Sequence, residues 1–133
     1  MSYVVLDTDV ASAVLRGRLP ASLRAQLAGK SLAITFVTVG ELTVWTALRH
    51  WGPRKLSDLA TWRRHVVTLP YDDAIAETWG MLQARATQRG RPRPINDTWI
   101  AACCLVERLP LATLNIKDFE DFSQYEGLEL IRA

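Results

Sequence analysis

The sequence predicts an α/β fold in which helices cover both faces of a parallel sheet. Five short apolar segments alternate along the chain with longer segments whose apolar residues recur at helical spacing. Alternation of this kind is typical of parallel strands joined by crossover helices. No repeat or linker divides the 133 residues, and 49% of them are hydrophobic, so we expect a single domain over residues 1–133 with a real core.

The strands are predicted from short apolar runs with clear ends. Residues 3–6 are apolar and meet Asp7, and residues 32–37 are rich in β-branched side chains. A third run stops at Pro70, which has no N–H to give to a sheet. The full set is expected at residues 3–6, 32–37, 66–69, 111–114 and 128–131.

The helices are predicted from capping residues and from the glycines that follow several of them. Asp7-Thr8-Asp9 offers caps for a first helix over residues 10–15, which Gly17 ends. The others are expected over residues 20–28, from a Thr38 cap to about residue 50, over residues 56–65, from Asp72 towards residue 90, from Asn96 or Asp97 onward, and over residues 117–122.

Acidic and amide side chains stand at strand ends and helix starts. They are Asp7 after the first strand, Glu41 one turn into the helix after the second, Asp97 in the first turn of its helix, and Asn115 and Asp118 after the fourth strand. Ligands of parallel sheets bind outside the carboxyl ends of the strands, where one crevice can collect these groups. Mg²⁺ prefers oxygen ligands and keeps several waters, so a few carboxylates suffice. The pattern therefore indicates metal-assisted phosphodiester hydrolysis.

Each acid also has a purely structural interpretation. Asp7 and Asp97 are good capping or first-turn residues, because the free N–H groups and the dipole of a helix start favour a carboxylate. Glu41 lies among apolar residues, but a lone glutamate there is often solvent-facing. The functional interpretation gains from the set, since caps do not require all of these acids to meet at one edge.

Four segments in order resemble the signature segments of PIN-domain ribonucleases, and most closely those of the VapC-type toxins of bacterial toxin–antitoxin pairs. The segments are MSYVVLDTDVAS, SLAITFVTVGEL, PINDTWIAA and LATLNIKDF. The resemblance covers the whole chain. It implies a three-layer α/β/α sandwich around a five-stranded parallel sheet and an acidic cluster that holds Mg²⁺ or Mn²⁺. It also implies an endoribonuclease that cuts tRNA, rRNA or mRNA, forms homodimers and is covered by a cognate antitoxin.

The resemblance assigns roles to residues of this sequence. Asp7, Glu41 and Asp97 match the family's first three acids. The polar positions that usually support them are Thr8, Asp9, Thr38, Asn96 and Thr113.

The fourth segment departs from the family pattern, which often reads Thr-x-Asp-x-Asp-Phe. Here an asparagine, Asn115, stands at the first acidic place, and one extra residue precedes Asp118. We expect Asp118 to supply the missing charge as a catalytic and metal-binding residue. Asn115 is expected to offer a neutral oxygen to the metal or to its water.

The charge distribution favours a polyanionic partner. Residues 1–65 hold nine Lys or Arg against four Asp or Glu, whereas residues 66–133 hold seven against ten. Arg89, Arg91 and Arg93 precede Asp97 and are predicted to contact RNA phosphates, which positions RNA without reading its sequence. A solvated basic loop is the alternative. Trp51 and Trp62 flank a further surface that we expect to meet a partner.

The chain has the composition of a cytoplasmic protein. No apolar run approaches the ~20 residues that cross a membrane, and the N-terminus does not read as a signal peptide. The two cysteines, Cys103 and Cys104, are adjacent, which disfavours an ordinary disulfide, and they lack the spaced partners of a zinc site. We expect both to be reduced and buried.

Two other classes of protein compete with the nuclease. A receiver-like signalling domain also places acids around Mg²⁺, but it needs an acid after the third strand and a lysine after the fifth. Pro70 and Arg132 stand there instead. A PIN fold that binds without cutting is the second, and Asn115 keeps it open. The sequence contains no Gly-x-x-x-x-Gly-Lys phosphate loop.

Overall fold

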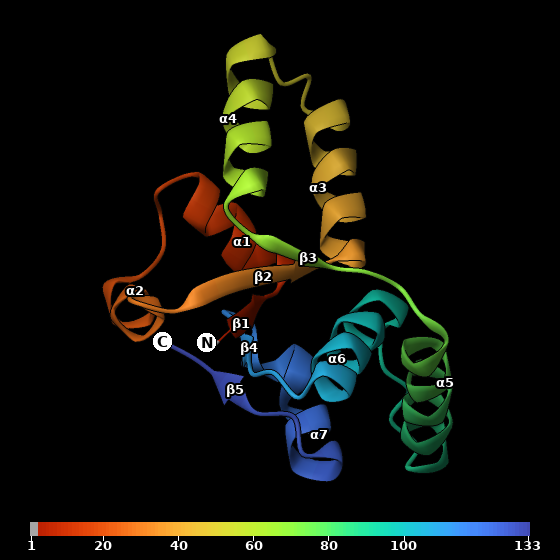
Figure 1. Ribbon diagram of the computed structural model, residues 1–133. Coiled ribbons are helices and arrows are strands. Elements are labelled where there is room, and N and C mark those ends of the chain that lie inside the picture. Colours follow the sequence, from red (N-terminus) through yellow and green to blue (C-terminus); the bar gives the residue numbers. More distant parts are fainter. Residues whose placement is uncertain (1–2) are drawn as a thin grey trace.

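A fully parallel sheet forms the centre of the computed structural model, which describes residues 3–133 (Figure 1). Its strands lie in the order β3-β2-β1-β4-β5 and are β1 (Tyr3–Leu6), β2 (Ser31–Thr35), β3 (Val67–Leu69), β4 (Leu111–Ala112) and β5 (Leu130–Ile131). The helices are α1 (Thr8–Leu15), α2 (Ala21–Leu27), α3 (Phe36–Leu48), α4 (Pro53–Arg64), α5 (Asp73–Gln88), α6 (Ile95–Glu107) and α7 (Ile116–Glu126). The predicted fold class is confirmed.

The core lies in two layers, one on each face of the sheet. Successive side chains of a strand point to opposite faces. Val5 of β1 accordingly packs in a cluster with residues of α5, α6 and α7, whereas Val4 and Leu6 pack with residues of α1 and α2. All three are at most 1% exposed. Burial on both faces explains why the strand reads as a continuous apolar run rather than an alternating one.

The strand order places the crevice of the sheet between β1 and β4. The chain leaves β1 towards β2 on one side, and β4 later pairs with β1 on the other side. Such a reversal opens a gap at the carboxyl ends of the two strands, where ligands bind. The order also differs from the 2-1-3-4-5 arrangement of receiver-like folds, so the receiver alternative is wrong.

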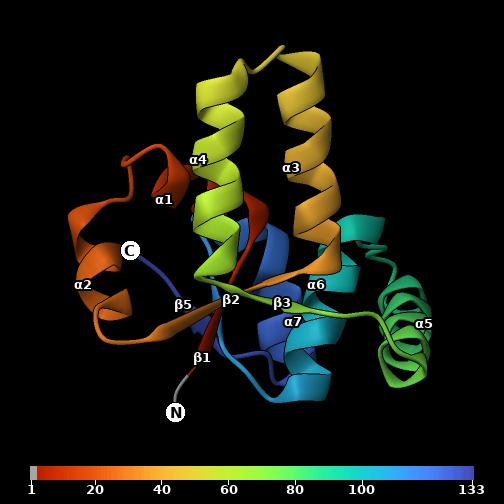
Figure 2. The same ribbon diagram turned by 45° about the horizontal axis from the view of Figure 1, so that its top comes forward.

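Helices α3 and α4 stand side by side and project away from the sheet (Figures 1 and 2). Helix α4 has a proline in its first turn and two arginines in its last turn, and both suit the ends of a helix. None of its residues is fully buried. This helical hairpin therefore offers most of its surface to solvent or to a partner.

Several element boundaries differ from the prediction, and two of them have a clear local reason. The strand predicted over residues 32–37 ends at Thr35, because the Thr35 hydroxyl accepts the N–H of Thr38 at 3.3 Å and caps α3. Thr38 is therefore in the first turn and is not the cap. Helix α6 begins before both predicted caps, with Pro94 at the N-cap, whose carbonyl accepts the Thr98 N–H at 3.1 Å. The last two strands are also shorter than predicted.

The cysteines are buried on α6 and form no disulfide, as predicted. Burial is the main cause that raises the pKa of the Cys103 thiol to about 12 and that of Cys104 well above its ordinary value. Among residues 3–133, no helix has the length and apolar character that crossing a membrane requires.

Candidate active site

A small cavity of about 80 Å³ lies at the carboxyl edge of the sheet. All four predicted catalytic acids line it, together with the predicted fourth-site amide. Its lining residues are Asp7, Thr8, Asp9, Glu41, Trp45, Asp97, Ile100, Asn115, Asp118 and Phe119. The structure thus brings together groups that come from α1, α3, α6, α7 and the ends of two strands.

Asp7 is both the cap of α1 and the most deeply placed acid of the cavity. It is 3% exposed. Its Oδ1 accepts the N–H of Val10 at 2.8 Å, and its Oδ2 accepts the hydroxyl of Thr113 at 2.6 Å. Thr113 reaches it because β1 and β4 are neighbours in the sheet. Burial nevertheless raises the pKa of Asp7 to about 6, against the lowering effect of these two hydrogen bonds.

Glu41 is held against α1 by a hydroxyl. Thr8 donates its hydroxyl to Oε1 of Glu41 at 2.6 Å, and the Thr38 hydroxyl lies 3.0 Å behind it. Because Thr8 has one hydroxyl proton and gives it to the carboxylate, Thr38 is the donor to Thr8. Thr38 is fully buried and outside the cavity, so it orients Glu41 through Thr8.

Asp97 enters the cavity from the first turn of α6. Burial is the largest cause that raises its pKa to about 6, followed by the negative charges of Asp118 and Glu41. The nearby Arg93 acts in the opposite direction. The predicted support Asn96 is exposed on the same turn and does not line the cavity.

The fourth site contains a contact that the sequence pattern did not indicate. The side-chain amide of Asn115 donates to the carboxylate of Asp9, and its backbone N–H donates to the Thr113 hydroxyl at 2.9 Å. The Asn115 carbonyl in turn accepts the backbone N–H of Asp118 at 3.0 Å. Asn115 therefore ties the loop after β4 to the start of α1, while Asp118 lines the cavity with a free carboxylate.

The donor set fits a hard divalent cation. Five carboxylates, one amide and a hydroxyl line the cavity, and no sulfur or imidazole ligand is among them. Their like charges contribute to the raised pKa values of Asp7 and Asp97, a cost that a cation relieves. In the described chain, no three acidic, histidine or cysteine side chains converge closely enough, as they stand, to hold one ion. If three of these side chains are to bind one metal ion, they must therefore move closer together.

Trp45 is a lining residue that the sequence interpretation missed. It stands four residues after Glu41 on α3, on the same face of the helix. That spacing was visible in the sequence. Ile100 and Phe119 complete the apolar wall of the cavity beside the acids.

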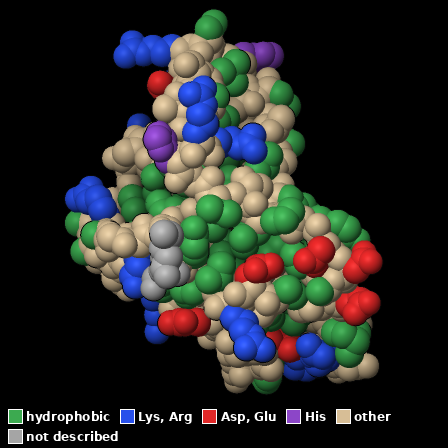
Figure 3. Space-filling view, in the orientation of Figure 1, with side chains coloured by type: hydrophobic (Ala, Val, Ile, Leu, Met, Phe, Trp, Pro, Cys, Tyr) green, Lys and Arg blue, Asp and Glu red, His purple; other side chains and the backbone are tan. Residues whose placement is uncertain are grey.

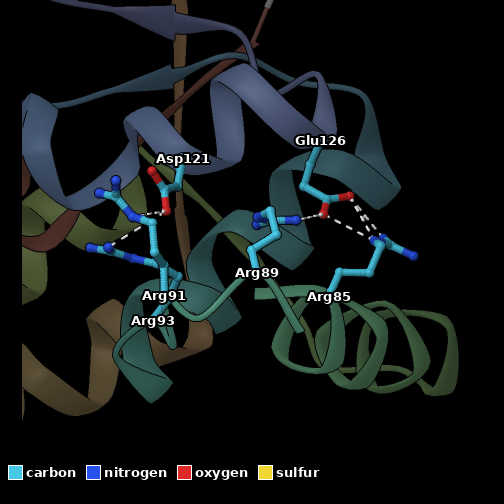
Figure 4. A network of polar contacts seen from close by, with 6 residues as sticks. All are labelled: Arg85, Arg89, Arg91, Arg93, Asp121 and Glu126. Atoms are coloured by element: carbon cyan, nitrogen blue, oxygen red, sulfur yellow. Dashed lines mark hydrogen bonds and ion pairs between the residues drawn. The ribbon is translucent and has the colours of Figure 1, made fainter. Parts of the chain in front are cut away.

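The predicted RNA-binding arginines have protein partners on α7 (Figure 4). Arg91 and Arg93 lie 3.2 and 3.7 Å from Oδ2 of Asp121, and Arg89 lies 3.4 Å from Glu126. Both carboxylates are almost buried, with side chains 4% and 8% exposed. The loop is therefore anchored on α7 and is not a solvated segment. Arg91 is the most exposed of the three, at 59%.

Known proteins with the same features identify the family. Residues 4–125 match the PIN domain. The chain is 35% identical to Ribonuclease VapC5 of Mycobacterium tuberculosis, over 97% of this chain and 94% of the relative. It is 28% identical to the tRNA(fMet)-specific endonuclease VapC of Shigella flexneri, over 90% and 92%. The chain therefore belongs to the PIN-domain family and, within it, to the VapC ribonucleases.

A solved structure agrees with this placement. The crystal structure of VapBC-5 from Mycobacterium tuberculosis, a member of the VapBC family of toxin–antitoxin systems, has a TM-score of 0.76 to this fold. The two chains are 30% identical and match over 100% of each. The three-layer sandwich predicted for a PIN-like chain is therefore found both in this structure and in a relative.

Proposed function

We propose that this protein is a metal-dependent endoribonuclease, the toxin of a toxin–antitoxin pair, that hydrolyses RNA phosphodiester bonds. The observation that carries the proposal is the cavity at the sheet edge, where carboxylates from four helices meet and burial raises the pKa of Asp7 and Asp97 to about 6. Carboxylates are held at this cost where a cation is to bind.

The residues that would hold the ion are Asp7, Glu41, Asp97 and Asp118, with Asn115 as a neutral ligand or as a hydrogen-bond partner. We propose Mg²⁺ as the ion, with Mn²⁺ as an equivalent. A divalent ion in such a site supplies Lewis-acid stabilisation of a phosphoryl oxygen and a more acidic water.

The protein's own contribution is to fix the carboxylates in place. Thr113 and the α1 N-terminus hold both oxygens of Asp7, and the Thr38–Thr8 relay aims Glu41 at the cavity. Asp97 is set by the first turn of a helix whose apolar side is buried. Geometry fixed in advance in this way lowers the cost of organising charge around the substrate.

The partners follow from the relatives. One relative is named as a tRNA(fMet)-specific endonuclease, and a solved relative belongs to a toxin–antitoxin family. We propose that this chain cuts tRNA, rRNA or mRNA, is neutralised by a cognate antitoxin and acts as a homodimer. The buried thiols fit a reducing compartment, so we place it in the cytoplasm.

The direct test is RNA cleavage by the purified protein with Mg²⁺, with Mn²⁺ and with excess chelator. The parent should cut only with a divalent ion, and Asp97→Asn should not cut while remaining folded. Asp73→Asn makes the same chemical change on the exposed first turn of α5, and it should cut like the parent. Cutting by Asp97→Asn, or in chelator, contradicts the proposal.

A second candidate function is RNA or protein binding without cleavage. The observation that favours it is the use of Asn115, in place of an acid, to bind Asp9. In that case the protein would bind Mn²⁺ in calorimetry and retain RNA in chelator, yet release no new RNA ends with any metal.

A further inference from the structure

A second, larger cavity of about 520 Å³ lies where the far ends of α1 and α3 meet the start of α4. Four of its lining side chains are cations and one is an acid. They are Leu15, Arg16, Arg18, Arg49, Trp51, Lys55 and Asp58. This volume is in the range of small-molecule binding sites. Figure 3 shows Lys and Arg side chains on the projecting hairpin, whereas acidic side chains gather on the lower part of the same face.

Within the described part of the chain, the cations of this cavity lack acidic partners, unlike those of the 89–93 loop. Among residues 3–133, no salt bridge joins Arg16, Arg18, Arg49 or Lys55 to a carboxylate. Arg89, Arg91 and Arg93 all have acidic partners on α7. Four unpaired cations around one hollow attract a polyanion far more strongly than a loop whose charges are already neutralised.

An aromatic surface stands among these charges. Trp51 forms part of the cavity wall and is partly buried, and the Lys55 ammonium lies 5.7 Å from its ring centre. Cationic grooves with an aromatic ring bind single-stranded nucleic acid, because phosphates pair with the cations and a base stacks on the ring.

The cationic and acidic cavities are separate, and side chains on one face of α3 lie between them. Glu41, Trp45 and Arg49 are spaced four residues apart and share one face of the helix. Trp45 lines the acidic cavity, the Arg49 guanidinium lies 5.4 Å from its ring centre, and Arg49 lines the cationic cavity. The contact between Trp45 and Arg49 therefore links the wall of one cavity to the wall of the other.

The spacing of the cavities suits a short run of RNA. Eight residues of α3 separate Glu41 from Arg49, a rise of roughly 12 Å at 1.5 Å per residue. In α1, the cap Asp7 and Arg16 are nine residues apart, a rise of roughly 13 Å. Nucleotides stacked at about 3.4 Å each cover that distance in three or four steps.

We propose that the cationic cavity binds the backbone of the RNA strand three or four nucleotides from the phosphate at the acids, with one base stacked on Trp51. This inference rests on the proposed function, since the position on the strand is counted from the phosphate that is cut at the acidic cavity. An acidic protein segment would also pair with the cations. RNA is favoured because the cavity adds a stacking surface and leads directly to a phosphodiester site.

The test is binding of a labelled single-stranded RNA by fluorescence anisotropy, in excess chelator and over a range of salt concentrations. The variant Arg18→Gln/Arg49→Gln/Lys55→Gln removes three exposed charges from the cavity. The slope of log binding constant against log salt concentration should decrease in magnitude by about 2, at ~0.7 for each lost contact with a single strand.

The matched control carries Lys30→Gln/Arg63→Gln/Arg64→Gln, which removes three exposed charges outside the cavity. It has the same net charge as the cavity variant and should keep a slope close to that of the parent. Thermal melts check that both triple variants are folded. Equal slopes for the two variants overturn the proposal.

The stacking part has its own variants. Trp51→Ala should weaken RNA binding by about tenfold, whereas Trp51→Phe should retain most of the affinity, because a base stacks on either ring. Equal loss in both variants contradicts stacking.

The remaining alternatives separate cleanly. A labelled oligoglutamate peptide that loses affinity for the cavity variant, while RNA does not, assigns the cavity to an acidic protein segment and overturns the proposal. A cavity-dependent RNA slope in a protein that never cuts RNA supports the cavity and rejects the proposed function. If the protein cuts RNA but the salt slope does not depend on the cavity cations, the proposed function is supported and the RNA-binding role of the cavity is rejected.

Discussion

Thr113, at the end of β4, donates its hydroxyl to Oδ2 of Asp7, at the end of β1, over 2.6 Å. The bond crosses the point where the strand order reverses, so it joins the two halves of the sheet at the acidic cavity. It also stabilises the charged form of a buried carboxyl, which makes Asp7 more acidic than burial alone would leave it.

Replacing this threonine tests that role. Thr113→Val keeps the shape and removes the hydroxyl, so the pKa of Asp7 should rise above about 6. Metal must displace a proton from a larger fraction of the molecules, and Mn²⁺ affinity at pH 6.5 should fall more than at pH 8. Calorimetric titrations at the two pH values measure this. Thr87→Val, on the exposed side of α5, is the control and should leave both affinities unchanged.

The stability of the metal-free protein should rise as the pH falls below 7. Asp7 and Asp97 have pKa values raised from 3.8 to about 6 in the folded state. The folded state therefore takes up protons that the unfolded chain does not, between about pH 6 and pH 4, and protonation stabilises the fold there. Thermal melts in chelator should show this rise, and Asp97→Asn should reduce it. A parent that loses stability steadily from pH 7 to pH 5 would contradict the prediction.

Asp118 and Asn115 should differ in their effect on metal binding. Asp118 brings a full charge to the cavity, whereas the Asn115 side chain is already bound to Asp9. Asp118→Ala should therefore weaken Mn²⁺ binding more than Asn115→Ala in calorimetry.

Asn115→Asp adds the acid that is commoner in the family. It should bind Mn²⁺ at least as tightly as the parent, but it replaces a hydrogen bond to Asp9 with repulsion. The metal-free variant should thus melt at a lower temperature. If Asn115→Ala weakens Mn²⁺ binding and Asp118→Ala does not, the two roles are reversed.

The ion pairs on α7 predict a stability effect for the basic loop. Arg93→Gln leaves the almost buried Asp121 with one cation in place of two and should cost about 2 kcal/mol of unfolding free energy. In the Asp121→Asn background the same change should cost much less, and urea unfolding of the four proteins gives this coupling. Additive costs would remove the ion pair as the cause.

The predicted RNA contact of the same loop needs a separate measurement. Arg91→Gln removes the most exposed of the three charges together with its 3.2 Å contact to Asp121, so urea unfolding must first show that the variant is folded. If Arg91 also contacts RNA, the salt slope of single-strand binding should fall by ~0.7. An unchanged slope restricts this arginine to its structural role.

Site residues that follow a strand or start a helix could be predicted from the sequence. Ion pairs between residues far apart in the chain could not. Asp7, Glu41 and Asp97 follow strands or start helices, and the geometry of a parallel sheet brings such positions to one edge. The pairing of Arg93 with Asp121 joins residues that no local pattern relates. That the chain is a single domain stays a prediction.

Helix starts were predicted wrongly where more than one residue suited the N-cap position. Thr35 and Thr38 both suit a cap, and only the backbone path decides that Thr35 does it. At α6, the two polar candidates lost the N-cap position to Pro94, which left Asp97 free to point into the cavity. The sequence therefore located the acid correctly but assigned it an additional capping role that it does not have.

Helix α6 has a chemical reporter of its own opening. Its first turn holds Asp97 and its middle holds Cys103 and Cys104, whose thiols are buried and protonated at neutral pH. The thiolate is the nucleophile that attacks thiol reagents, so these buried, protonated groups react only when the helix leaves the core. The rate of thiol labelling thus measures how often α6, the helix that carries Asp97, unfolds locally. Anything that binds across that cavity and holds α6 down should slow this labelling in proportion to its occupancy.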